Sequence, residues 1–396
     1  ELFGAERYHW NGGHSPSSLM RLWYMAWLGG VDVLQPEAAQ LTFFAWQPEQ
    51  KDNYVEKLIF VPKDRDQRAV LSPIGKRAQA FLAVTERHPD RGIPFTPFAV
   101  VLDQYAGFGG QELTLPRPWG LLEPMLGDRE ICLFWDVIFP GSLGLETIIP
   151  QDDRGEQNCV GQGTSPFGDT FDVLTTTAAP AVLRPYPVLI LLGEQELSPA
   201  LVQRLEDYLR QGGHLCLTYA HVENRGPELE RLRRAGRVEL FGLRRSDLEE
   251  PLDKTRWYTG ACWGFSDERL EKERTRRALR PYEVSFQAEV ARLATRLADE
   301  YLPIRVEGCV EFSLNRTVSG WVVGLINHQG VGKRAIEPAV LDASKKQTAR
   351  ITAPHGEWKE AMEWTRDRRL DVRAGTVQLE VPAGEVRIVE FQTTSL

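Results

Sequence analysis

Three Ser-Pro dipeptides, each directly before an amphipathic segment, constrain the fold more than any other feature of the sequence. They lie at 15–16, 72–73 and 198–199. Serine is a favourable helix N-cap, and proline at the first helical position has no N–H group to leave unpaired. The dipeptides therefore predict three helix starts. Glycine pairs at 29–30 and 212–213 are typical ends for the first and third of these helices.

Apolar runs flank the first helix, at 2–5 and 31–34, and a carboxylate, Glu6 or Glu37, follows each run. The two carboxylates are 37 − 6 = 31 residues apart, about the length of one β-α-β unit. Because the strands of such a unit are parallel, both carboxylates would lie at one edge of the sheet, where α/β barrels place their chemistry. Residues 1–92 are therefore predicted to be the last β/α units of a TIM barrel. A complete (β/α)8 barrel needs ~250 residues, so we expect its other units to precede this chain.

A second α/β segment is predicted at 95–302. Fully apolar runs alternate there with helices, which is typical of a parallel sheet covered on both faces. The charged stretch 228–250 indicates a solvated helix and loop, and the apolar spacing from Phe286 to Leu297 predicts a long closing helix. The predicted strands are 98–102, 171–174, 187–192 and 215–218.

In its order of strands and helices this segment resembles class I glutamine amidotransferases, so we expect a Rossmann-like domain. An amidotransferase needs an exposed cysteine on a sharp, glycine-flanked turn between a strand and a helix. Cys216 instead lies inside a predicted strand, between Leu215 and Leu217. We interpret Cys216 as a buried structural cysteine and the segment as non-catalytic, which disfavours an amidase.

The last segment, 303–396, has a different pattern. Apolar and polar residues alternate over short runs with turns between them, which predicts a small antiparallel β-sandwich. The clearest of these runs are 310–314, 376–381 and 386–391. The whole chain is thus predicted to be α/β in class: the C-terminal part of a barrel, a Rossmann-like domain and a β-sandwich.

Net charge and cysteine use exclude several classes of function. The formal net charge is -8 and the pI about 5.6, which argues against a nucleic-acid partner. The five cysteines are widely spaced and include no C-x-x-C pair, so neither a zinc motif nor a disulfide framework is recognisable. The longest apolar runs are too short to span a membrane. We expect a cytoplasmic protein without membrane contact, metal or cofactor.

The order of these parts resembles glycoside hydrolase family 42, the β-galactosidases with a trimerisation domain. Gly4-Ala5-Glu6 followed by Trp10-Asn11 is similar to the family's seventh barrel strand with its nucleophile. The resemblance extends over nearly the whole chain, through Met20-Arg21-Leu22-Trp23, Leu71-Ser72-Pro73-Ile74-Gly75-Lys76, Tyr186-Pro187-Val188-Leu189-Ile190 and Gly212-Gly213-His214-Leu215.

The resemblance implies retaining hydrolysis of a carbohydrate, with Glu6 as the catalytic nucleophile. Two carboxyl groups ~5–5.5 Å apart share this chemistry, one attacking the anomeric carbon and one acting as acid and base. The nucleophile must stay ionised, and the neighbouring cation Arg7 would help. Glu37 is expected to bind a sugar hydroxyl. The other candidate substrate contacts are Tyr8, His9, Trp10 and Trp46.

Two hypotheses of different class remain open. The family's acid/base residue lies on a fourth barrel strand that this chain lacks, so the chain alone is expected to be inactive. The alternative is a non-catalytic carbohydrate-binding or oligomerisation subunit. By resemblance the middle segment would form a homo-oligomer, a trimer, and the aromatic residues that favour such a contact are Trp119, Trp135, Trp257 and Trp263.

Overall fold

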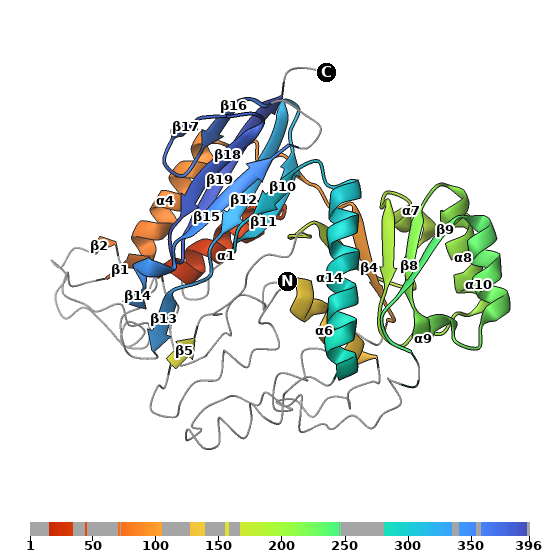
Figure 1. Ribbon diagram of the computed structural model, residues 1–396. Coiled ribbons are helices and arrows are strands. Elements are labelled where there is room, and N and C mark those ends of the chain that lie inside the picture. The colour runs from red at the N-terminus through yellow and green to blue at the C-terminus, as the bar shows by residue number, and fades with distance from the viewer. Residues whose placement is uncertain are drawn as a thin grey trace. The chain divides into compact units, whose positions relative to one another are not determined.

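The computed structural model is a mixed α/β protein with a five-stranded parallel sheet and several antiparallel sheets (Figure 1). Its residues belong to two compact units. Unit 1 comprises 1–95, 146–164 and 303–396, and unit 2 comprises 96–145 and 165–302. The structure describes residues 16–34, 44–45, 70–71, 73–104, 127–138, 155–157, 167–244, 246, 281–334, 340–353 and 358–393.

The parallel sheet forms the centre of unit 2. Its strand order is β6-β4-β7-β8-β9, and every neighbouring pair is parallel. Numbered along the chain this is the order 2-1-3-4-5, one of the common doubly wound arrangements. Three of the strands are buried at every position, which confirms the prediction from their continuous apolar runs. The strands are β4 (Phe98–Leu102), β6 (Phe171–Thr175), β7 (Val188–Leu191), β8 (His214–Thr218) and β9 (Arg237–Phe241).

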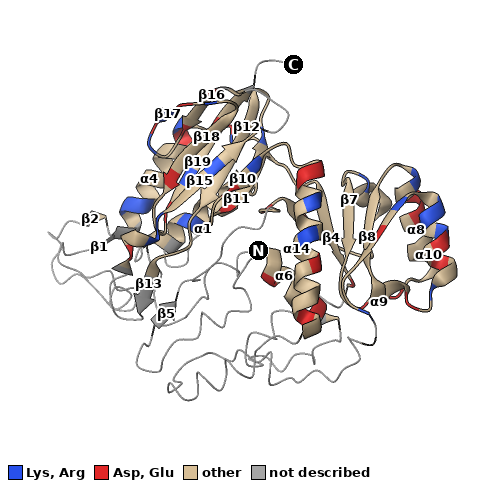
Figure 2. Ribbon diagram, viewed as in Figure 1, with Lys and Arg blue, Asp and Glu red and all other residues tan. Residues whose placement is uncertain are grey.

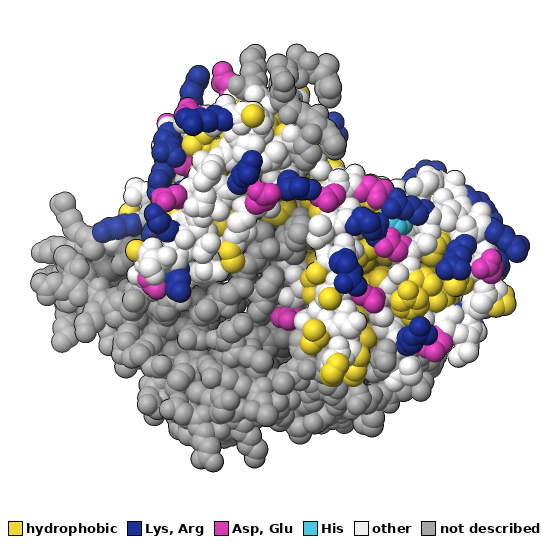
Figure 3. Space-filling view, viewed as in Figure 1, with side chains coloured by type: hydrophobic (Ala, Val, Ile, Leu, Met, Phe, Trp, Pro, Cys, Tyr) yellow, Lys and Arg dark blue, Asp and Glu magenta, His cyan; other side chains and the backbone are white. Residues whose placement is uncertain are grey.

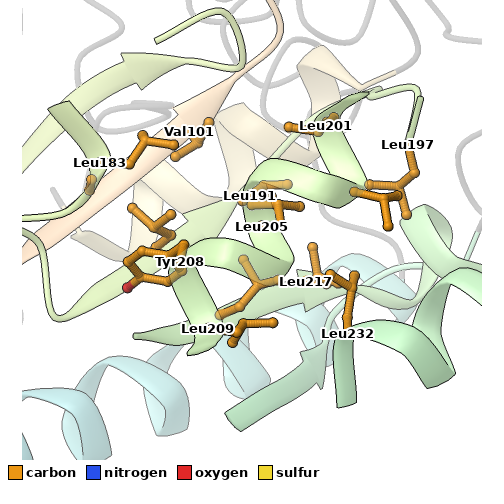
Figure 4. Packing of buried hydrophobic residues seen from close by; sticks show 14 of the residues in the cluster. Val101, Leu183, Leu191, Leu197, Leu201, Leu205, Tyr208, Leu209, Leu217 and Leu232 are labelled. Atoms are coloured by element: carbon orange, nitrogen blue, oxygen red, sulfur yellow. The ribbon is translucent and has the colours of Figure 1, made fainter. Parts of the chain in front are cut away.

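Helices cover both faces of this sheet, as predicted (Figure 1). On one face, leucines of α8 (Pro199–Arg210) and α10 (Gly226–Ala235) pack against apolar side chains of β7 and β8 (Figure 4). The other face carries α6 (Asp128–Ile138) and the long α14 (Pro281–Tyr301). Two short helices, α7 (Pro180–Leu183) and α9 (Tyr219–Val222), complete the unit.

The third Ser-Pro signal acts as expected. The Ser198 side chain accepts a hydrogen bond from the Leu201 backbone N–H at 3.3 Å, and Pro199 is the first residue of α8. The charged stretch that begins at Glu228 does contain a helix, α10, with charges of both signs along it (Figure 2). Strand β9 within the same stretch was not predicted. It lies at the edge of the sheet, and the many charges around Arg237 and Glu239 led to the interpretation of the whole stretch as helix and loop.

Antiparallel sheets form most of the described part of unit 1. A six-stranded sheet has the order β17-β16-β19-β12-β11-β3, and two three-stranded sheets have the orders β10-β15-β18 and β14-β13-β5. The six strands are β3 (Ile93–Pro94), β11 (Glu311–Arg316), β12 (Gly320–Ile326), β16 (Trp358–Glu363), β17 (Arg368–Leu370) and β19 (Val386–Thr393). The others are β5 (Gly155–Gln157), β10 (Arg305–Glu307), β13 (Val331–Arg334), β14 (Val340–Leu341), β15 (Gln347–Thr352) and β18 (Thr376–Val381), with the 3-10 helix η2 (Ala343–Lys345).

Two helices cover one face of the six-stranded sheet. They are α1 (Pro16–Leu28) and α4 (Pro73–Arg87), which start at the other two predicted Ser-Pro signals. Trp23, Trp27 and Phe81 pack with Val322 and Ile388 of the sheet in one buried cluster. The helices predicted to belong to the barrel thus share a core with the antiparallel sheet. The predicted three-domain division at 92 and 302 stays a prediction.

The predicted strand at 31–34 is wrong. These residues have no regular structure, and the side chains of Val31 and Val33 are 41% and 80% exposed. A strand exists only where a neighbour pairs with its backbone, and no described strand pairs with this run. The short strands β1 (Phe44–Ala45) and β2 (Val70–Leu71) pair with each other, antiparallel. In the described ranges, no helix combines the length and apolarity needed to cross a membrane.

Candidate functional site

The predicted sugar site lies outside the residues that the structure describes. This holds for Glu6, Arg7, Tyr8, His9, Trp10, Glu37 and Trp46. The separation of the two carboxylates therefore stays a prediction. What the structure describes is helix α1, which lies between Glu6 and Glu37 along the chain.

Helix α1 is held in unit 1 by buried polar contacts at both ends. Near its start the Ser17 hydroxyl donates to the Gly384 carbonyl at 2.5 Å. At its last residue the Leu28 carbonyl accepts from the Asn315 side-chain amide at 2.8 Å. Both polar side chains are buried. The ends of the helix are thus fixed by bonds to distant parts of the chain.

A buried chain of three side chains fixes the middle of the same helix. Arg21 donates from Nη1 to His328 Nδ1 at 2.7 Å, and His328 Nε2 lies 2.7 Å from Glu311 Oε2. Because a guanidinium can only donate, Nδ1 must accept and the imidazole proton lies on Nε2, bonded to the carboxylate. Burial holds the pKa of His328 below its usual value, so the ring is neutral. We assign an anchoring role to this row of three hydrogen-bonded side chains.

In unit 2 a second polar cluster lies at the carboxyl ends of β7 and β8. The Gly193 N–H donates to Glu130 Oε1 at 2.9 Å, and the Gly193 carbonyl accepts from His221 Nε2 at 2.6 Å. His221 Nδ1 in turn accepts from the Thr218 N–H at 3.2 Å. Both nitrogens of His221 are therefore bonded to the backbone, and the cluster binds the two peptide groups on either side of Gly193.

Burial keeps both titratable groups of this cluster uncharged near neutral pH. It raises the pKa of Glu130 to about 8 and lowers the pKa of His221 to about 4. Such shifts, at the carboxyl edge of an open α/β sheet, are features that often mark a functional site.

Here, however, the chain fills the described part of that edge itself. Gly193 has a φ of +76°, and a Cβ on Gly127 would lie 1.9 Å from the Glu194 backbone nitrogen. The start of α6 thus packs directly on the turn after β7. In open α/β sheets a ligand normally binds at this place.

A third cluster lies on the face of the sheet that α14 covers. His214 Nε2 is 3.3 Å from Glu239 Oε2 and 3.8 Å from Cys216 Sγ, and His214 Nδ1 is 3.3 Å from the Tyr301 hydroxyl. Cys216 lies inside β8 and is fully buried, as predicted, and burial raises the pKa of its thiol strongly. There is no exposed turn at this cysteine, so an amidotransferase nucleophile is ruled out at this position.

Sequence reasoning missed Glu130, His221, His214 and Glu239. Glu130 and His221 belong to no recognisable sequence motif, because their hydrogen-bond partners are backbone groups. The last two could have been found from the alternation of Arg237-Val238-Glu239-Leu240 after Gly236, which marks a strand beside β8. Charged side chains on the face shown in Figure 3 are mixed in sign, without a broad basic surface among the described residues.

No protein-family model matches the chain, and no curated protein matches it. Solved structures similar to it include glycoside hydrolases. A catalytic mutant of Gan42B, a GH42 beta-galactosidase from G. stearothermophilus, is 12% identical with a TM-score of 0.39, and 98% of this chain and 58% of that chain are covered. An alpha-L-fucosidase isoenzyme 2 from Paenibacillus thiaminolyticus is 12% identical with a TM-score of 0.41, at 82% and 52% coverage.

A third similar structure is an exo-carrageenase GH42 from Bacteroides ovatus, 7% identical with a TM-score of 0.39; 81% of this chain and 33% of that chain are covered. The chain therefore spans between a third and three fifths of the length of these three proteins. At such low identities and TM-scores the likeness says nothing about the activity of this chain.

Proposed function

We propose that this chain is the C-terminal part of a retaining glycoside hydrolase of the β-galactosidase type, with Glu6 as its nucleophile. The observation that carries the proposal is the run Gly4-Ala5-Glu6 with Trp10-Asn11, directly before the start of α1 at Pro16. A carboxylate followed by an aromatic loop and a helix start fits the C-terminal end of a barrel strand, where the active sites of such barrels lie. The finer fold, a barrel end, an amidotransferase-like domain and a β-sandwich, belongs to the same proposal.

In this proposal the two carboxylates at either side of α1 have different roles. The Glu6 carboxylate attacks the anomeric carbon as the glycosidic bond breaks, and water later releases the sugar from the ester. Arg7 keeps Glu6 ionised, and Glu37 binds a sugar hydroxyl. Tyr8, His9, Trp10 and Trp46 form the walls of the sugar site. By resemblance, the acid/base residue belongs to an earlier barrel strand.

The anchoring of α1 supports this arrangement. In the sequence Glu6 is ten residues before the first residue of the helix and Glu37 nine residues after its last. Arg21 of the helix is bound to His328 and through it to Glu311. A catalytic carboxylate must be held close to its productive geometry. A rigid helix between the two loops would provide a fixed frame for them.

Covalent labelling tests the nucleophile without needing the acid/base residue. A 2-deoxy-2-fluoro-β-glycosyl fluoride loses fluoride without protonation, and the fluorine at the neighbouring carbon slows release of the sugar from the enzyme. We expect the galactosyl reagent to modify the peptide that contains Glu6, seen as a mass increase by peptide mass spectrometry. The Glu6→Gln variant should not be labelled, whereas Glu37→Gln should be labelled more slowly.

Labelling of Glu37 in place of Glu6 would reverse the assignment of the two carboxylates. The decisive sample is the protein with the earlier barrel units present: if galactosyl, glucosyl and fucosyl fluorides all fail to label it, it is not a hydrolase of this type. Folding is checked in the same samples by circular dichroism and by a cooperative thermal transition.

The second candidate function is a non-catalytic carbohydrate-binding or oligomerisation subunit. The exposed, irregular run at 31–34 favours it, because the barrel strand that should carry Glu37 is not formed there. The filled carboxyl edge of unit 2 also favours another use for that unit, such as a homotrimeric contact. Of the tryptophans proposed for this contact, Trp135 is described, and its ring is 5.2 Å from Phe171 within unit 2. Sedimentation velocity at micromolar concentration should then show a trimer. A monomer would exclude the homotrimeric contact.

A further inference from the structure

The cluster of His214, Cys216 and Glu239 has no part in the proposed hydrolysis. We propose that it is a binding site for a zinc-type divalent ion. The three protein ligands would be His214 Nε2, Cys216 Sγ and a carboxylate oxygen of Glu239. One histidine, one thiolate and one carboxylate are ligand types that Zn²⁺ accepts, and three protein ligands leave a fourth position for water.

The register of two parallel strands brings these ligands together. Cys216 of β8 lies directly beside Glu239 of β9. His214 is two residues before Cys216 and therefore points to the same face of the sheet. That face is buried under α14, where Tyr301 reaches His214. Two ligands thus come from one strand and the third from its neighbour, so the site cannot be recognised from a sequence motif.

The distances between the ligand atoms suit a tetrahedral ion. All three atoms lie within 4.8 Å of one another, with 3.3 Å from His214 Nε2 to Glu239 Oε2 and 3.8 Å from His214 Nε2 to Cys216 Sγ. Zinc bonds of about 2.0–2.3 Å place neighbouring tetrahedral ligands roughly 3.3–3.6 Å apart. The two distances from His214 Nε2 are close to these values, and movement of the Cys216 and Glu239 side chains toward a common centre would complete the arrangement.

Surrounding side chains orient two of the ligands. The Tyr301 hydroxyl lies 3.3 Å from His214 Nδ1, which leaves Nε2 facing the cluster. Arg296 is bonded to Glu239 Oε1, so Oε2 is the oxygen that faces His214. Partners of this kind, which bind a ligand's other polar atom, are usual around metal sites. The neighbouring cation Arg237 is paired with Glu300, at 2.8 Å between Nη2 and Oε2.

With the metal bound, a Cys216 thiolate and a Glu239 carboxylate bring two negative charges to one divalent cation, while Arg296 stays bonded to the carboxylate. Metal binding releases the thiol proton, as it does wherever cysteine is a ligand. The competing interpretation is a cluster without metal, in which His214 pairs with Glu239 and Cys216 is a buried structural side chain in contact with the His214 ring. Only the metal site requires a Cys216 thiolate, so the cysteine discriminates between the two.

The test uses the full chain without a histidine tag, freed of metal with a chelator and then titrated with Co²⁺. Cobalt bound to a thiolate shows a sulfur-to-metal charge-transfer absorption. We expect one cobalt per chain with this band, and competition by Zn²⁺. Cys216→Ser should lose the band, and Glu239→Gln should weaken cobalt binding at least tenfold. The matched control is Cys309→Ser, because Cys309 is the other described free cysteine and lies in unit 1; it should keep the band.

Absence of the band in the unmodified protein, or an unchanged band in Cys216→Ser, would overturn the proposal. Metal-free variants are compared with the metal-free parent by circular dichroism to verify folding. If Cys216→Ser does not fold, Glu239→Gln decides. The Glu239 side chain is 29% exposed, so its replacement disturbs the core least, and unchanged cobalt affinity in that variant would equally exclude the site.

Discussion

The two ends of β8 carry two buried histidines in contrasting surroundings. His221, just after the carboxyl end of the strand, has both ring nitrogens bonded to backbone groups, at 2.6 and 3.2 Å. The ring nitrogens of His214, at the amino end, lie near side chains of the described residues, at 3.3 to 3.8 Å. Short bonds to the backbone leave no room for a ligand and stabilise a turn. Longer contacts among ionisable side chains leave a space that an ion can fill.

The contrast predicts that the carboxyl end of β8 matters most for stability. His221→Ala leaves the buried Gly193 carbonyl and Thr218 N–H without partners. Each such group costs ~1–3 kcal/mol, so we expect a loss of about 2–6 kcal/mol in the free energy of unfolding. Urea unfolding followed by tryptophan fluorescence measures it. A loss within experimental error would show that the two bonds are not important for the turn.

Gly193→Ala should have the next largest effect, about 1–3 kcal/mol, because a side chain in a left-handed backbone conformation is strained. Its Cβ would also lie 2.8 Å from Ile131 Cδ1. The thermal transition midpoint measures the effect. The control is Gly212→Ala, which has a similar φ of +93° but no atom within 4 Å of the new Cβ. If both variants lose the same stability, backbone strain alone is responsible and the close packing contributes nothing.

Glu130→Gln should change the pH dependence of stability in one direction. The pKa of Glu130 is about 8 in the folded protein, against 4.5 ordinarily. Between these values the folded state holds a proton that the unfolded chain has lost, so the free energy of unfolding decreases as the pH rises. Glutamine keeps the acceptor for the Gly193 N–H but cannot ionise. The variant should therefore gain stability over the parent toward pH 8.

His221 contributes an opposite slope in the same measurement. Its pKa is about 4 in the folded protein, against 6.5 ordinarily. Between these values the unfolded chain binds a proton that the folded state does not, so stability decreases as the pH falls. In the parent this slope is opposed by that of Glu130 wherever the two windows overlap, between pH 4.5 and 6.5, so the acidic decrease should be steeper in Glu130→Gln than in the parent. Chemical unfolding from pH 4 to 8 measures both profiles, and a Glu130→Gln profile identical to that of the parent would contradict a buried, protonated Glu130.

The smallest effect is expected at the amino end of β8. In the metal-free protein, Glu239→Gln should cost about 1 kcal/mol, because it weakens the contacts to Arg296 and His214 at a partly exposed side chain. Saturating Zn²⁺ should widen the difference between parent and variant, since the ion stabilises the state that binds it. Thermal transitions with and without Zn²⁺ provide the measurement. If the stability difference between the parent and Glu239→Gln is the same with and without Zn²⁺, His214 has a purely structural role, as His221 does.

Much of the fold was predictable because its signals are local. The Ser-Pro starts of α1, α4 and α8, and the apolar runs of β4, β7 and β8, depend on capping and burial within a few residues. The strand predicted at 31–34 failed because a strand also needs a partner, which local sequence cannot specify. Strand β9 was missed for a related reason: as an edge strand it is half-exposed and rich in charge.

The sequence by itself determined where α1, α4 and α8 begin and which central strands are buried, and it identified Glu6 and Glu37 as candidates for sugar chemistry. Only the tertiary structure decided which polar groups meet. Cys216 and Glu239 are neighbours through strand register, and Tyr301 joins His214 through the docking of α14. Periodicity and capping act over one or two turns of chain, whereas these contacts join residues far apart in the sequence, whose proximity depends on how whole elements pack.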